Sequence, residues 1–74
     1  MVDIQFTSAA EEYFKKLKDK RLKKAFVDAI DKVRQNPYIG EEKRGDLSTL
    51  YGFDVHYAGS NYELAYRIYE NNGR

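Results

Sequence analysis

Apolar and polar residues alternate along this chain with two different periods. Val2 to Phe6 alternate every second residue, which is typical of a strand with one buried face. Between Ser8 and Val33 the apolar residues recur at helical spacings instead. The strand-like alternation returns from Gly52 to Tyr57 and again from Tyr62 to Tyr69. The pattern therefore predicts one strand, a helical region and then two further strands.

The helical region divides into two helices that we expect to form a hairpin. Ser8 and Glu11 have the spacing of a capping box, which predicts that Ser8 caps the first helix. Residues 18–21 contain no apolar side chain and separate two apolar stripes. Pro37 has no N–H, so the second helix should end near Asn36. The stripes comprise Ala10, Tyr13, Phe14 and Leu17 in the first helix and Leu22, Phe26, Ala29, Ile30 and Val33 in the second.

The C-terminal half predicts a β-hairpin. Residues Ala58 to Asn61 form a short loop between two alternating segments. The polar segment from Glu41 to Thr49 predicts only a weak strand or an ordered loop. A strand, two helices and a run of antiparallel strands predict an α+β fold over residues 1–74, with both helices on one face of a single sheet. We expect the other face to carry the residues out of phase with the apolar ones, namely Asp54, His56, Glu63, Arg67 and Tyr69.

The composition limits the classes of protein to which this chain can belong. A chain of 74 residues supports one domain with one small core. It has no cysteine and one histidine, so no ligand set for a metal is evident and we expect neither metal nor cofactor. No segment approaches the roughly 20 apolar residues of a membrane span, and no signal peptide is evident. We therefore expect a cytoplasmic protein that does not bind a membrane.

Charge is distributed unevenly, although the net charge is only +1. The segment from Lys15 to Arg34 holds nine basic and three acidic residues, a net charge of +6. This run is either a solvated helix surface or a docking surface for nucleic acid or an acidic partner. Under the second interpretation the contact residues are Lys15, Lys16, Lys20, Arg21, Lys23 and Lys24.

Several segments together resemble the RelE/ParE superfamily of toxins. They are Asn36-Pro37-Tyr38, Gly45-Asp46-Leu47, the run from Leu50 to Tyr57 and the run from Asn61 to Tyr69. The similarity covers nearly the whole chain, but the sequence ends before the family's last strand, which carries a further arginine and a tyrosine. The resemblance implies a toxin of a type II toxin–antitoxin system, neutralised by a cognate antitoxin, whose target is mRNA in the ribosome or DNA gyrase.

The resemblance also suggests which residues carry activity. Members that cleave mRNA use basic side chains and a tyrosine on the sheet to stabilise developing charge and to transfer protons. By position, Lys43, Arg44, His56 and Arg67 are the candidate catalytic residues. Glu63 stands where an arginine is common, which reverses the charge at that position and argues against nuclease activity. Tyr69 could stack on a base or serve only in packing.

Three alternatives follow for the function of the chain. It could be an endoribonuclease, a non-catalytic binding toxin of the gyrase-inhibiting kind or an inactive relative, or a fragment of a longer toxin. Arg67 could bind phosphate or instead form an ion pair with Glu63 or Asp54. Without a following strand, the run from Tyr62 to Tyr69 should be an open sheet edge. An antitoxin strand, a second copy of the chain or a missing C-terminal segment would then cover it.

Overall fold

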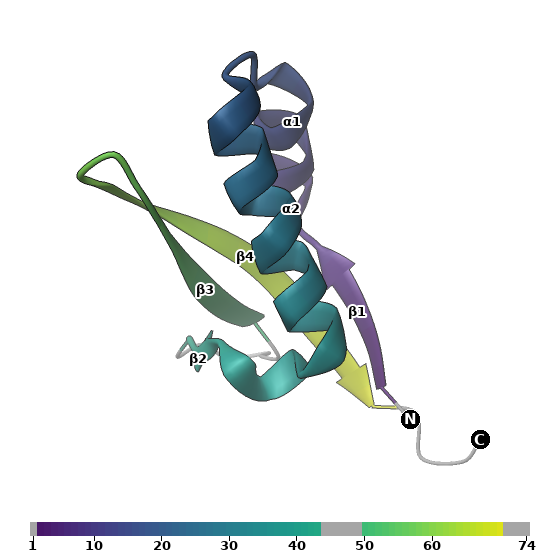
Figure 1. Cartoon of the computed structure of the whole chain (residues 1–74). Coiled ribbons are helices and arrows are strands. Elements are labelled where there is room, and N and C mark those ends of the chain that lie inside the picture. The colour runs from purple at the N-terminus through teal and green to yellow at the C-terminus, as the bar shows by residue number, and fades with distance from the viewer. Residues whose placement is uncertain (1, 44–49, 71–74) are drawn as a thin grey trace.

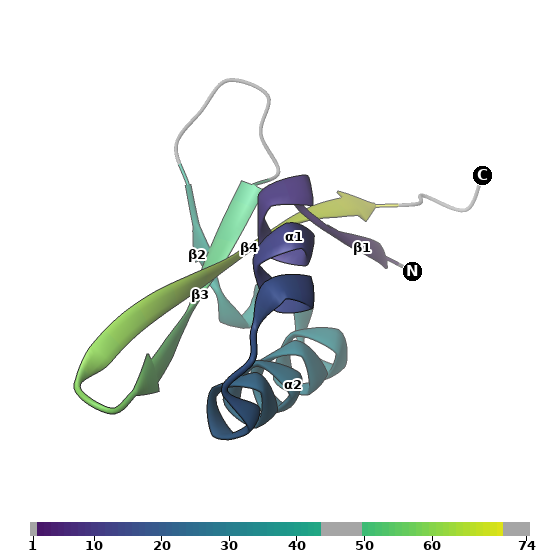
Figure 2. The same ribbon diagram turned by 90° about the horizontal axis from the view of Figure 1, so that it is seen from above.

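A computed structural model of the chain describes residues 2–43 and 50–70, which form an α+β fold (Figure 1). Two helices lie on the same face of a four-stranded antiparallel sheet whose strand order is β1-β4-β3-β2 (Figure 2). The fold class predicted from the sequence is confirmed. The elements in chain order are β1 (Val2–Phe6), α1 (Ser8–Lys16), α2 (Lys20–Gln35), the short 3₁₀ helix η1 (Pro37–Ile39), β2 (Glu41–Glu42), β3 (Leu50–Tyr57) and β4 (Ser60–Glu70).

Strand β4 lies in the centre of the sheet. It pairs with β3 from Ser60 to Arg67 and with β1 from Tyr66 to Glu70. The prediction of an open edge from Tyr62 to Tyr69 is therefore wrong from Tyr66 onward, whereas no strand among the described residues pairs with Tyr62 to Leu64 on that side. The first strand of the chain closes that side over Tyr66 to Glu70, and a pairing between residues 60 to 68 positions apart is not visible in the local alternation of the sequence.

The helix boundaries follow from capping side chains. Thr7, not Ser8, is the N-cap of α1, because its Oγ1 accepts a hydrogen bond from the backbone N–H of Ala10 at 3.1 Å. The predicted capping box is thus misplaced by one residue. Asp19 caps α2, and the helix ends at Gln35 with Asn36 as its C-cap, as predicted.

The core lies between α2 and the two central strands. Helix α1 contributes no fully buried residue and covers the core with half-buried side chains. The predicted stripe of α2 is buried except for Ile30, which is half-buried. The buried residues are Leu22, Phe26, Ala29 and Val33 of α2, Val55 of β3, and Leu64, Tyr66 and Ile68 of β4.

Tyr66 attaches the segment after α2 to the sheet. Its side chain is fully buried, and its hydroxyl donates to the carbonyl oxygen of Pro37 at 2.7 Å and accepts from the N–H of Gly40 at 3.1 Å. Its ring stacks on Tyr51 with 5.8 Å between ring centroids. These contacts fix where the chain leaves α2 and enters β2.

Candidate functional site

The sheet face opposite the helices carries the polar residues of the two long strands. Asp54 is level with Glu63, His56 with Asn61, and Arg67 with Leu50. Because side chains alternate between faces, these residues lie opposite the buried Val55, Leu64 and Tyr66. We call this polar side of the sheet the open face. Tyr69, level with Asp3 on β1, also belongs to it and is 46% exposed.

An ion pair crosses the open face at Gly52. Lys43 Nζ lies 2.6 Å from Glu63 Oε2, although Lys43 follows β2 and Glu63 belongs to β4, on the other side of β3. A side chain on Gly52 would occupy the same space, since a Cβ there would meet the Glu63 carboxylate at 2.6 Å and Lys43 Cε at 2.8 Å. The hydrogen bond that the Lys43 ammonium donates to the Glu63 carboxylate raises the pKa of Lys43, and the negative charges of Glu41 and Asp54 raise it further. Lys43 is therefore a cation engaged by a carboxylate.

The other candidate catalytic residues do not gather around Lys43 in one centre. His56 is exposed near the hairpin turn, level with Asn61, whereas Arg67 is six residues further along β4. At about 3.3 Å per residue this separates their backbones by roughly 20 Å. Arg67 forms no ion pair with any residue in 2–43 or 50–70, so the alternative in which it pairs with Glu63 or Asp54 is wrong. Arg44 lies outside the described residues.

Lys43, Arg67 and Tyr69 do share one end of the sheet. The N–H of Lys43 donates to the carbonyl oxygen of Leu50, and Leu50 is the partner of Arg67 on β4. Lys43 and Arg67 therefore lie in one row across the sheet, two strand spacings or roughly 10 Å apart at the backbone. Tyr69 follows two residues later on the same face.

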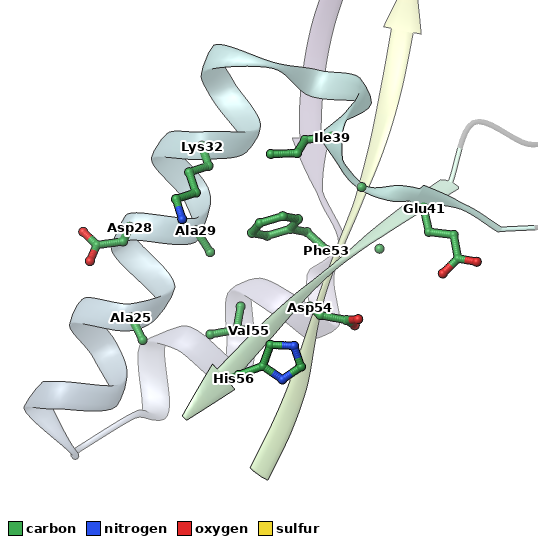
Figure 3. Close-up of a pocket in the computed structure, with 12 residues that line it drawn as sticks. Ala25, Asp28, Ala29, Lys32, Ile39, Glu41, Phe53, Asp54, Val55 and His56 are labelled. Carbon is green, nitrogen blue, oxygen red and sulfur yellow. The ribbon is translucent and has the colours of Figure 1, made fainter. Parts of the chain in front are cut away.

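A groove of about 620 Å³ lies between α2 and the edge of β3 (Figure 3). Phe53 and Val55 point from β3 toward α2, and Ile39 approaches from the connection between α2 and β2, whereas His56 points away from the helix. The walls of the groove come from segments far apart in the chain, so no sequence pattern predicts the groove. The lining comprises Ala25, Asp28, Ala29 and Lys32 of α2, Ile39, Gly40 and Glu41, and Gly52, Phe53, Asp54, Val55 and His56 of β3.

The basic residues predicted to bind a partner gather where α1 turns into α2. Asp19, between them, uses its carboxylate to accept from the N–H groups of Arg21 and Leu22 at 3.0 and 3.2 Å. Lys23 lies over the ring of Phe14 at 5.1 Å. Two lysines form exposed ion pairs within one helix, Lys16 with Glu12 at 3.7 Å and Lys24 with Asp28 at 3.4 Å. We call this region the basic turn; it comprises Lys15, Lys16, Lys18, Lys20, Arg21, Lys23 and Lys24.

Two other features are absent from the described parts of the chain. Residues 2–43 and 50–70 contain no group of three or more histidine, aspartate or glutamate side chains placed to hold a metal ion. In the same residues neither helix has the length and apolar character needed to cross a bilayer.

The sequence was compared with known proteins. Residues 4–74 match a family model described as the ParE-like toxin of type II bacterial toxin-antitoxin systems. No curated protein and no solved structure matches the chain. The family model spans nearly the whole sequence, and the α+β fold agrees with the fold that the resemblance implied. The chain therefore belongs to the ParE-like family of toxins of type II bacterial toxin–antitoxin systems.

Proposed function

We propose that this toxin acts by binding its target and does not cleave mRNA. The observation that supports the proposal is the arrangement of the open face. Lys43 is engaged by Glu63 at 2.6 Å, and His56 lies roughly 20 Å from Arg67 by strand rise. Cleavage of RNA needs an acid, a base and a cation around one phosphate, all within hydrogen-bonding reach of the reacting atoms. The candidates that the structure describes, Lys43, His56 and Arg67, do not meet that requirement together.

The target we propose is DNA gyrase, and the surface that contacts it or its bound DNA is the basic turn. Five of its cations form no ion pair with a residue that the structure describes, namely Lys15, Lys18, Lys20, Arg21 and Lys23. Lys20 and Arg21 also lie in the first turn of α2, where the helix dipole is already positive. A concentration of positive charge of this kind favours an acidic or phosphate-rich partner. Family membership implies an antitoxin, which we propose neutralises the toxin in the cytoplasm.

Two assays with the purified chain test this proposal. We expect inhibition of DNA supercoiling by gyrase and no ribosome-dependent cleavage of mRNA. Addition of the antitoxin should restore supercoiling. Ribosome-dependent cleavage that is lost on Arg67→Ala would contradict the binding mechanism.

Salt dependence tests the role of the basic turn. Affinity for the gyrase–DNA complex should fall as salt rises from about 50 to 300 mM, because the contacts are between exposed charges. Charge reversal at Lys20, Lys23 and Lys24 should remove most of that dependence. Arg34→Glu, at the far end of α2, is the matched control and should change little. A salt-independent affinity would show that the basic turn is only a solvated surface.

A ribonuclease is the second candidate, and one observation favours it. Arg67 forms no ion pair among the described residues, and Tyr69 lies exposed two residues further along the same face. A phosphate at that end of the sheet could therefore meet a cation and a phenol. In this case Arg67→Ala and Tyr69→Phe should abolish cleavage, whereas His56→Ala should leave it unchanged because His56 is at the other end of the hairpin.

A further inference from the structure

The outer edge of β3 is only partly covered. The N–H of Lys43 donates to the carbonyl oxygen of Leu50 at 2.8 Å, and Glu41 pairs with Gly52. In an antiparallel pair every second residue directs its backbone groups to the same side, so the even-numbered residues of β3 face outward. Lys43 and Glu41 cover the first two of these positions, Leu50 and Gly52. Among residues 2–43 and 50–70, no strand pairs with the outward backbone groups of Asp54 and His56.

This uncovered edge is also one wall of the groove. An extended segment placed along it would continue the line of β2 and would lie beside α2. Its side chains would alternate between the two faces of the sheet. Those on the helix side would meet Ala25, Phe53 and Ile39, and Ile39 is 41% exposed without such a segment. The volume of the groove, about 620 Å³, is within the range of pockets that bury a ligand.

Negative charge at the groove indicates which side chains such a segment should carry on its other face. Asp54 and Glu41 are exposed carboxylates at the sheet side of the groove. Neither forms an ion pair with a residue that the structure describes, and the nearby Lys43 is engaged by Glu63. Asp54 has only a long hydrogen bond of 3.4 Å from the Asn61 amide. A lysine or arginine directed to the open face would therefore meet a carboxylate that forms no ion pair among the described residues.

We infer that an extended segment of the antitoxin pairs with Asp54 and His56 as an added strand, with apolar residues toward α2 and a basic residue opposite Asp54. This inference rests on the proposed toxin function and identifies where its protein partner docks. The opposite edge of the sheet, at β1, is less suited. The hollow there is smaller, about 480 Å³, and contains the charged Asp3, Glu11 and Arg34.

Amide hydrogen exchange on the chain, free and in complex with its co-expressed antitoxin, tests the inference. In the complex the amides of Asp54 and His56 should exchange at least about tenfold more slowly, as expected for edge groups that gain ladder hydrogen bonds. The amides of Phe53 and Val55 already face β4 and serve as internal controls. Unchanged exchange at Asp54 and His56 in the complex would overturn the inference. So would protection at Ile4 on the β1 edge in their place.

Two variants and a control test the chemistry of the groove. Asp54→Asn should weaken antitoxin binding by about threefold to tenfold at low salt and less at high salt. Ile39→Ser should weaken binding at every salt concentration, whereas Val27→Ser should not, because Val27 is at least as exposed as Ile39 but lies outside the groove. Equal losses for the Ile39 and Val27 variants would contradict the proposed position.

Two results distinguish an antitoxin strand in the groove from a second copy of the chain, and the docking site from the proposed function. If the Asp54 and His56 amides were protected in the free chain and lost protection on dilution, a second copy would occupy the edge and the inference would fail. Growth arrest and gyrase inhibition by the free chain should not depend on this edge, because the proposed contact with gyrase is the basic turn. The proposed function can therefore fail or succeed independently of the docking site.

Discussion

The contact between Gly40 and Tyr66 gives the most specific stability prediction. A Cβ on Gly40 would lie 2.5 Å from Tyr66 Oη and 2.8 Å from the carbonyl oxygen of Gly52. The backbone at Gly40 has φ −78°, which any residue adopts, so the constraint is steric. Overpacking of this kind costs about 1–3 kcal/mol. Tyr66→Phe should also cost about 1–3 kcal/mol, because it leaves the Pro37 carbonyl and the Gly40 N–H without their partner.

The two changes should not be additive. Phenylalanine at position 66 lacks the hydroxyl that the new methyl group would strike, so it relieves the shorter of the two close contacts. The double variant should therefore be more stable than the sum of the single effects predicts, by about 0.5–3 kcal/mol. For a domain of this size each kcal/mol corresponds to about 4–8 °C in melting temperature, which is readily measured.

Urea unfolding of the wild type, both single variants and the double variant forms the required cycle. Tyr69→Phe is the control, because Tyr69 is exposed and should tolerate the change with no loss of stability. Additivity within about 0.3–0.5 kcal/mol, the usual result for independent sites, would refute the proposed contact. A Gly40→Ala variant as stable as the wild type would refute it as well.

Three further predictions concern other parts of the molecule. Asp19→Ala should destabilise the chain to urea by about 1 kcal/mol, because it removes the N-cap of α2; unchanged stability would show that the cap is dispensable. Gly52→Ala should displace the Lys43–Glu63 pair, and NMR titration of Lys43 Nζ should then give a lower pKa than in the wild type. Burial raises the pKa of the Tyr66 hydroxyl despite the opposing hydrogen bond from the backbone, and the pKa of Lys43 is raised too. Both groups therefore stabilise the fold below about pH 10, and this stabilisation is lost as pH rises through the pKa values of the folded state. The melting temperature should fall above that pH, and less steeply in Tyr66→Phe; a flat alkaline profile would contradict this.

The sequence by itself determined the elements and the faces they bury. Alternation identified β1, β3 and β4, and helical spacing identified the stripe of α2 from Leu22 to Val33. Pro37 marked the end of that helix. These signals are local, since each arises from the geometry of a few consecutive residues. They also placed the polar residues of the hairpin opposite the apolar ones, on the face away from the helices.

Only the tertiary structure decided which groups meet. Strand β1 returns to pair with β4 from Tyr66 to Glu70, contrary to the sequence-based prediction of an open edge there, and β2 leaves the edge of β3 uncovered at Asp54 and His56. Glu63 reaches Lys43 across Gly52, a contact between three segments separated along the chain. The groove likewise depends on how α2 lies against the β3 edge. Pairing and packing between distant segments are set by the energy of the whole fold, and local spacing carries no record of them.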